Sequence, residues 1–209
     1  MFDLDGTLVD TLADLAAAGN HAFAAVGFPG YPAPEYRRLV GQGLDQLMLD
    51  GLPQATDAQR REAKAAFLRH YAQHRYDQTR PYDGIPELLD QLDRRGVPTA
   101  VMSNKPHEAA DDMVRQLLGA ARFAAVRGHQ AGYPVKPDPT AALEIAEQLG
   151  VPADRWFYLG DTDVDMLTAR AAGFRPVGVT WGFRDRAELQ AAGAAHLIDH
   201  PRQLIDLLE

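Results

Sequence analysis

The sequence predicts an α/β protein in which a parallel sheet forms the core and a helical segment is inserted after the first strand. Apolar runs alternate with helical patterns from residue 81 onward, whereas residues 11–80 show helical patterns alone. Polar clusters follow directly after several of the apolar runs. Apolar strands separated by helices are typical of a parallel sheet covered on both faces. We therefore expect a core of residues 1–10 and 81–209 and a helical insert of residues 11–80.

The insert is expected to consist of helices joined by short loops. Its first helix is rich in alanine, and Asp10 or Thr11 could cap its beginning. Prolines at 29, 32 and 34 then interrupt the helical pattern. The expected helices cover Thr11–Val26, about Glu35–Val40, about Leu44–Leu49, and Thr56 or Asp57 to about Tyr76.

The segment from Pro81 onward is expected to alternate between helices and strands. The expected helices are Ile85–Arg95, Pro106–Leu118, Pro139–Leu149 and Asp163–Ala172. The expected strands are Val97–Met102, Phe123–Arg127, Trp156–Leu159, Val177–Thr180 and His196–Ile198. In such sheets the chemistry gathers just beyond the carboxyl ends of the strands, so the polar clusters there should converge.

Composition excludes several classes of protein. The net charge of −8 argues against broad nucleic-acid binding, which needs clustered positive charge. No apolar run reaches the roughly 18 to 20 residues of a membrane-spanning helix. The absence of cysteine excludes disulfides, thiolate catalysis and cysteine-ligated zinc, and it fits a cytoplasmic location. The sequence leaves the oligomeric state open.

Two carboxylates stand one residue apart near the start, in Met1-Phe2-Asp3-Leu4-Asp5-Gly6-Thr7-Leu8. Positions i and i+2 of a strand point the same way, and Asp5 lies where the strand should break, so the backbone can bend around an ion. This suits phosphoryl transfer in which Asp3 attacks phosphorus, Asp5 handles a proton and Mg²⁺ offsets the gathered charge. An acidic turn without chemistry is the alternative.

Ser103-Asn104-Lys105-Pro106 follows an expected strand and should open a helix. A hydroxyl beside backbone N–H groups at a helix N-terminus can cradle a phosphate. Ser103 and Asn104 are therefore candidate substrate-binding residues, with simple helix capping as the alternative.

Lys136 stands in a proline-rich loop, Val135-Lys136-Pro137-Asp138-Pro139. The prolines restrict the backbone, so Lys136 could hold the Asp3 carboxylate and phosphoryl oxygens together by charge. An exposed loop lysine is the alternative. We expect replacement of Lys136 to impair catalysis far more than replacement of Lys105.

Acidic residues also follow the expected strand at 156–159, in Gly160-Asp161-Thr162-Asp163-Val164-Asp165. Asp161 and Asp165 are four residues apart and could share a face, and hard oxygen ligands at a strand end suit Mg²⁺. We assign Asp161 to the metal and Asp165 to orienting Asp161 or Lys136. Acids also favour helix N-termini for dipole reasons alone.

In order, these four segments resemble the signature motifs of the haloacid dehalogenase superfamily, over most of the chain. The resemblance implies a Rossmann-like catalytic core with an inserted helical cap. It implies that Asp3 is the nucleophile and Asp5 the general acid/base. It also implies that Ser103 and Lys136 bind phosphate, and that Asp3, Asp161 and the main-chain carbonyl of Asp5 bind Mg²⁺. Dehalogenase members lack the second Asp, so Asp5 indicates a phosphatase or phosphomutase.

Further segments resemble the phosphoglycolate phosphatase branch of this superfamily. Val40-Gly41-Gln42-Gly43-Leu44 resembles the cap loop of that branch, which makes Gly41, Gln42 and Gly43 candidate substrate-binding residues. The segments Ser103–Pro106, Trp181–Arg184 and Ala192–Asp199 are also similar to that branch. The resemblance implies hydrolysis of a small phosphorylated metabolite, with 2-phosphoglycolate first. A sugar phosphomutase, a pyrophosphatase and a catalytically silent binding or scaffold protein are the alternatives.

One departure concerns the first strand, since Met1 and Phe2 are the apolar residues that precede Asp3. A central strand this short should anchor Asp3 poorly, and a displacement of about 1 Å can reduce a rate by on the order of 100-fold. Our hypothesis is that the coding start is mis-assigned or that the sequence is trimmed at this end.

Overall fold

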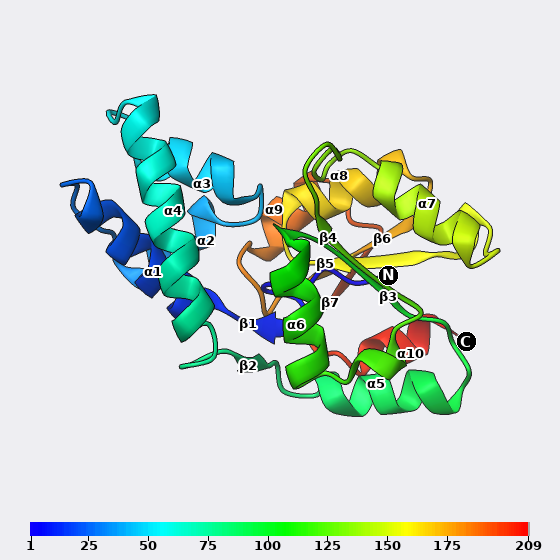
Figure 1. Ribbon diagram of the computed structural model, residues 1–209. Coiled ribbons are helices and arrows are strands. Elements are labelled where there is room, and N and C mark those ends of the chain that lie inside the picture. Colours follow the sequence, from blue (N-terminus) through cyan, green and yellow to red (C-terminus); the bar gives the residue numbers. More distant parts are fainter. Residues whose placement is uncertain (209) are drawn as a thin grey trace. The chain divides into compact units, whose positions relative to one another are not determined.

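The computed structural model describes residues 1–208 and divides the chain into two compact units (Figure 1). One unit comprises Met1–Val9 together with the segment from Pro81 onward, and the other comprises Asp10–Arg80. The role of the second unit as a cap stays a prediction.

The first unit contains a parallel β-sheet. Its strands are β3 (Ala100–Pro106), β4 (Ala125–His129), β5 (Phe157–Gly160), β6 (Arg175–Val179) and β7 (His196–Ile198). Strand β3 pairs with β4, and β6 lies between β5 and β7, always in parallel. Phe2 bridges Val101 and Leu159 in parallel, so the order is β4, β3, the opening segment, β5, β6, β7. The predicted α/β class is confirmed.

The opening segment lies in the middle of this sheet and is fixed on both sides. The Phe2 N–H donates to Ala100 O at 2.8 Å, and the Met102 N–H donates to Phe2 O at 2.9 Å. On the other side, the Asp3 N–H donates to Leu159 O at 2.9 Å. The expectation that so short a strand would anchor Asp3 poorly is therefore wrong, because both neighbouring strands bond to its backbone.

Helices cover the sheet of the first unit. They are α5 (Ile85–Arg94), α6 (His107–Leu117), α7 (Thr140–Gln148), α8 (Asp163–Ala171), α9 (Arg186–Ala191) and α10 (Gln203–Leu207), with 3-10 turns at Ala120–Arg122 and Ala153–Arg155. Figure 1 shows α7 and α8 on one side of the strands and α5 and α10 on the other. A buried cluster joins α7 and α8 to the sheet; it comprises Met1, Ala100, Met102, Ala141, Ala142, Ile145, Ala146, Trp156, Tyr158, Ala169, Ala172 and Phe174. Burial of this apolar surface is the main force that holds the layers together.

The second unit is helical. It contains α1 (Leu12–Ala25), a 3-10 turn (Ala33–Glu35), α2 (Tyr36–Leu39), α3 (Leu44–Gly51) and α4 (Asp57–His74). A capping box between Thr56 and Gln59 begins α4. The buried Asp14 carboxylate accepts hydrogen bonds from the Gln78 N–H, the Thr79 N–H and the Thr79 hydroxyl, which ties α1 to the end of this unit. Short strands β1 (Val9–Asp10) and β2 (Arg80–Pro81), which the sequence did not predict, pair at the boundary of the units.

One correction concerns Ser103–Pro106, which we predicted to open a helix. These residues instead extend β3, and α6 begins at His107. Pro106 has φ −49° and ψ 134°, and a residue before proline avoids helical geometry, so the helix cannot begin earlier. Ser103 and Asn104 thus lie within strand β3 and not at a helix N-terminus. Among residues 1–208, no helix is both long and apolar enough to span a bilayer.

Candidate active site

Asp3 and Lys136 meet at the carboxyl edge of the sheet. Lys136 Nζ lies 2.8 Å from Asp3 Oδ1 and 2.7 Å from Asp165 Oδ1. The Lys136 side chain is 2% exposed and that of Asp165 is fully buried. The contact with Asp165 is a hydrogen bond, and the contact with Asp3 is an ion pair at the buried Oδ1 atom. Lys136 is therefore a buried cation between two carboxylates.

Asp161 follows β5 and is held by residues from two other loops. Its Oδ1 accepts from the Thr7 hydroxyl at 2.9 Å, and its Oδ2 accepts from the Phe183 N–H at 2.8 Å. Gly6 has φ +82°, and a Cβ there would lie 2.2 Å from Asp161 Oδ2. The Gly6-Thr7 turn therefore needs glycine both for its left-handed backbone and for its close approach to this carboxylate.

Asp165 accepts hydrogen bonds from Thr162 and Lys136. Its Oδ2 accepts from the Thr162 N–H at 3.0 Å and from the Thr162 hydroxyl at 2.7 Å, while Oδ1 accepts from Lys136. Because each oxygen of Asp165 is engaged in this way, the residue is suited to orienting Lys136.

Three buried carboxylates form a group that fits a metal ion. One carboxylate oxygen each from Asp3, Asp161 and Asp165 lies within 4.8 Å of the others. Three ionised carboxylates beside the Lys136 ammonium would leave two negative charges unbalanced, and a dication would neutralise them. Oxygen donors of this kind suit a hard divalent cation such as Mg²⁺.

The pKa values of these groups reflect their burial and mutual charge. Burial raises the pKa of the Asp3 carboxyl to about 7, against the opposing effect of Lys136 and with a further contribution from Asp165. Burial also raises the pKa of Asp161 well above its usual range, and the charges of Asp165 and Asp3 add to this. Burial alone would lower the pKa of Lys136, but Asp165 and Asp3 outweigh it and raise that pKa well above its ordinary value. Lys136 is thus charged, while Asp3 and Asp161 hold protons more tightly until a cation replaces them.

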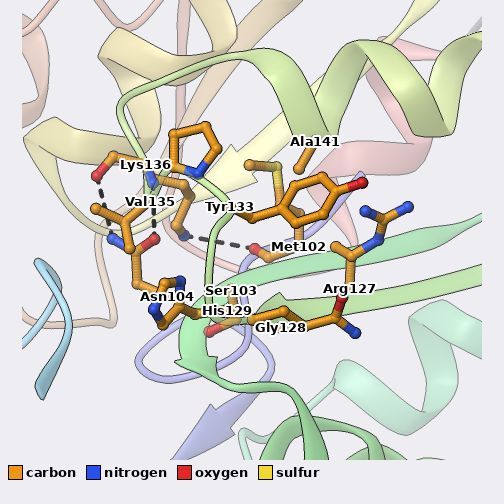
Figure 2. A pocket seen from close by; sticks show the side chains of 12 residues that line it. Met102, Ser103, Asn104, Arg127, Gly128, His129, Tyr133, Val135, Lys136 and Ala141 are labelled. Atoms are coloured by element: carbon orange, nitrogen blue, oxygen red, sulfur yellow. Dashed lines mark hydrogen bonds between the residues drawn. The ribbon is translucent and has the colours of Figure 1, made fainter.

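Ser103 and Asn104 stand beside this group on β3. The Asn104 side-chain amide donates to Lys136 O at 3.2 Å, and its oxygen accepts from the Lys136 N–H at 2.7 Å (Figure 2). Asn104 therefore fastens the loop of Lys136 to the sheet. Ser103 Oγ accepts from the Lys105 N–H at 3.2 Å, a bond that leaves the hydroxyl hydrogen for a different acceptor. Their contact with substrate stays a prediction.

Asp5 contacts a cation that the sequence analysis did not place in the site. Lys105 Nζ lies 2.9 Å from Asp5 Oδ1 and 3.1 Å from Oδ2, and the Lys105 side chain is 3% exposed. We had expected replacement of Lys105 to affect catalysis much less than replacement of Lys136. The contact with Asp5 makes Lys105 unsuitable as that control. The chain has three lysines, at 64, 105 and 136, and the rarity of this residue was the signal that could have singled out Lys105.

The segment Trp181–Arg184 resembled the phosphoglycolate phosphatase branch, but its contacts at the site were not predicted. Trp181 Nε1–H donates to Thr7 O at 3.0 Å, and the Arg184 N–H donates to Asp161 O at 3.2 Å. With Phe183, these residues make the loop after β6 a support for Asp161. Gly41, Gln42 and Gly43 belong to the second unit, and their role as substrate contacts stays a prediction.

A comparison with known protein families identifies the class of protein that carries this sheet and its strand-end carboxylates. A model of the haloacid dehalogenase-like hydrolase family matches residues 1–179. The chain belongs to this family, which confirms the predicted resemblance.

Named relatives of this chain are phosphatases. It is 33% identical over 211 residues to an N-acetylmuramic acid 6-phosphate phosphatase of Pseudomonas aeruginosa, with 100% of this chain and 93% of the relative covered. It is 32% identical over 214 residues to a phosphoglycolate phosphatase of Vibrio vulnificus, with 99% and 94% covered. A crystal structure from Lactobacillus delbrueckii subsp. bulgaricus, of a proposed phosphoglycolate phosphatase, matches with a TM-score of 0.93 and 31% identity, covering 99% of this chain and 96% of that one.

Proposed function

We propose that this protein hydrolyses a small phosphate monoester with the help of Mg²⁺, through a phosphorylated Asp3. The observation that carries the proposal is the buried group of Asp3, Asp161 and Asp165 with Lys136 Nζ 2.8 Å from the Asp3 carboxylate. A nucleophile, a cation and oxygen ligands for a metal are the parts that phosphoryl transfer requires.

In the first step an Asp3 carboxylate oxygen attacks the phosphorus in line. A bond forms between this oxygen and phosphorus, and the bond from phosphorus to the ester oxygen breaks. Asp5 gives its proton to the departing alkoxide. Lys136 lies beside Asp3, and its charge favours the extra negative charge of the transferring group.

In the second step water hydrolyses the aspartyl phosphate. Asp5, now ionised, takes a proton from the water as its oxygen bonds to phosphorus, and the Asp3 carboxylate is released. Asp5 thereby regains the proton it lost in the first step. Asp165 acts through Lys136, which it holds by a 2.7 Å hydrogen bond.

Asp3, Asp161 and the main-chain carbonyl of Asp5 are the groups that would hold Mg²⁺. When bound, the ion offsets the charge of the carboxylates and phosphate, which allows the two anions to approach. The raised pKa of Asp3 supports this assignment, since a site that gathers several carboxylates needs a compensating cation.

We propose 2-phosphoglycolate as the first substrate to test, supported by relatives of that name. N-acetylmuramic acid 6-phosphate is the second, supported by the Pseudomonas aeruginosa relative.

We further propose that residues 10–80 act as a cap whose Gly41-Gln42-Gly43 loop contacts substrate. Gly41 has φ +117° and Gly43 has φ +90°. Residues other than glycine would be strained in this left-handed backbone conformation. A cytoplasmic location, supported by the absence of cysteine, completes the proposal.

A steady-state panel tests this function. Free phosphate is measured with 2-phosphoglycolate, N-acetylmuramic acid 6-phosphate, other sugar phosphates, nucleotides and pyrophosphate, with Mg²⁺ or with EDTA. We expect at least one monoester to release phosphate, and we expect EDTA and Asp3→Asn each to abolish the release. Return of phosphate to a second sugar hydroxyl would identify a phosphomutase, and preference for pyrophosphate would identify a pyrophosphatase. Release no greater than that of Asp3→Asn with every substrate would refute the proposal and favour a binding or scaffold protein.

A further inference from the structure

The pair of Asp5 and Lys105 has a geometry that suits control of a proton-transfer group. The ammonium of Lys105 donates to both oxygens of the Asp5 carboxylate, at 2.9 and 3.1 Å. The Lys105 side chain is 3% exposed and that of Asp5 is 17% exposed. A cation that contacts both oxygens restrains the plane of the carboxyl group, and the burial of Lys105 strengthens the interaction by lowering the local dielectric.

The backbone that carries Lys105 is itself held in place. The Lys105 N–H donates to Ser103 Oγ at 3.2 Å. On the neighbouring strand, a Cβ on Gly128 would lie 2.7 Å from Lys105 O, so β4 packs directly against this residue. The base of the Lys105 side chain is therefore fixed from two directions before the side chain reaches Asp5.

The two buried lysines have different carboxylate partners. Lys136 contacts Asp3 and Asp165, whereas Lys105 contacts Asp5. The first pairing lies at the proposed nucleophile and the second at the proposed acid/base. An ammonium is a compact charge on a flexible stem and differs from a planar guanidinium in shape and donor geometry, so arginine is not an equivalent replacement at this position.

We propose that Lys105 is a positioning residue that holds the Asp5 carboxyl group in the orientation needed for proton transfer. It acts in both steps, when Asp5 protonates the departing alkoxide and when Asp5 accepts a proton from water. Lys105 itself forms no bond to phosphorus and gives up no proton. This inference rests on the proposed phosphatase function. It assigns proton transfer in that function to Asp5, with Lys105 as the residue that orients it.

The choice of leaving group provides the test. An alkoxide such as that of glycolate must be protonated as it departs, whereas p-nitrophenolate departs without a proton. We would measure single-turnover release of glycolate from 2-phosphoglycolate and of p-nitrophenol from p-nitrophenyl phosphate, before water attacks the aspartyl phosphate. If 2-phosphoglycolate is not the best alkyl phosphate of the panel, the best one replaces it. For Lys105→Met we expect alkoxide release to fall on the order of 100-fold, the size of a general acid effect, and nitrophenol release to fall less than about tenfold.

A double-mutant cycle separates positioning from general damage. If Lys105 acts through Asp5, Lys105→Met should slow release of the alkoxide by less than about twofold in an Asp5→Asn background, because the group that it orients is already absent. Lys64→Met is the matched control, since Lys64 pairs with Asp45 in the other unit and its side chain is 37% exposed. Lys105→Arg keeps the charge and should lose part of the alkoxide rate with the nitrophenol rate preserved.

Equal losses with both leaving groups, or a Lys105→Met effect that is undiminished in Asp5→Asn, would overturn the inference. Thermal melts of each variant accompany the rates; if Lys105→Met fails to fold, Lys105→Arg supports the same comparison. A wild-type protein that releases neither product would refute the proposed function instead, so the two failures are distinguishable.

Discussion

Replacement of Lys136 by methionine should destabilise the protein far more than an ordinary lysine substitution. Methionine preserves most of the side-chain volume but removes the charge 2.8 Å from Asp3 and 2.7 Å from Asp165. Removing one partner of a buried ion pair leaves an uncompensated charge and destabilises a protein by roughly 3 to 5 kcal/mol. For a chain of this size each kcal/mol lowers the melting temperature by about 2 to 4 °C. We therefore expect a loss of about 6 to 20 °C.

The chain supplies its own control in Lys64, whose Nζ lies 2.6 Å from Asp45 Oδ1. This distance is shorter than either Lys136 contact, yet the side chains of Lys64 and Asp45 are 37% and 75% exposed. Exposed pairs contribute about 0 to 1 kcal/mol, so Lys64→Met should melt within about 4 °C of the wild type. The comparison tests burial, since distance alone would predict the opposite ranking.

The effect of Lys136→Met should also depend on pH. Lys136 lowers the pKa of Asp3 against the effect of burial, so removal of the lysine makes Asp3 harder to ionise in the folded state. Unfolding lets the carboxylates ionise in water, and this drives unfolding more strongly as the pH rises. Melting curves in EDTA should therefore show a larger loss at pH 8 than at pH 5. If Lys136→Met and Lys64→Met melt together at pH 8, the buried ion cluster is refuted.

Two further predictions concern the same carboxylates. In metal-free protein burial raises the pKa of Asp3 from 3.8 to about 7. The folded state therefore binds this proton more tightly than the unfolded state does, and Asp3 lowers the unfolding free energy progressively as the pH rises through that range. Urea unfolding should show Asp3→Asn gaining stability relative to the wild type as pH rises; parallel pH profiles would contradict this. Gly6→Ala would place a Cβ 2.2 Å from Asp161 Oδ2, whereas Gly96→Ala, also at positive φ (+63°), meets nothing within 4 Å. Mg²⁺ titrations followed by thermal shift should show weakened binding in Gly6→Ala and unchanged binding in Gly96→Ala, and equal affinities would argue against Asp161 as a ligand.

The parallel sheet could be predicted because most of its strands contain a short apolar run and helical patterns separate these runs. Asp161 follows such a run, so its place at the sheet edge was predictable from the strand alone. The same signal failed at Ser103–Lys105, where β3 continues through polar residues. An apolar run marks the part of a strand that packs in the hydrophobic core. In β3 the apolar run ends at Met102, whereas the strand continues to Pro106. Helices α9 and α10 are short and bury few residues, so their patterns were too brief to predict.

The partners within the site could not be predicted from the sequence. Lys105 and Asp5 are 100 residues apart, and Thr7 and Asp161 are 154 residues apart. A motif places a residue at the end of a strand, but the side chain it meets depends on strand order and on rotamers. Sequence reasoning brought Asp3, Lys136 and Asp161 to one edge. The structure was needed to pair Lys105 with Asp5.

The central claim is that Asp3 is transiently phosphorylated, and a trapping experiment tests it most directly. The protein is mixed with the best substrate of the panel, carrying labelled phosphate, and is quenched with acid within a single turnover. Proteolysis and mass spectrometry then locate the label. We expect an acid-stable, hydroxylamine-sensitive phosphoryl group on Asp3, and none in Asp3→Asn. Product release by the wild type with label on another residue, or with none on the protein at any time, would contradict the mechanism.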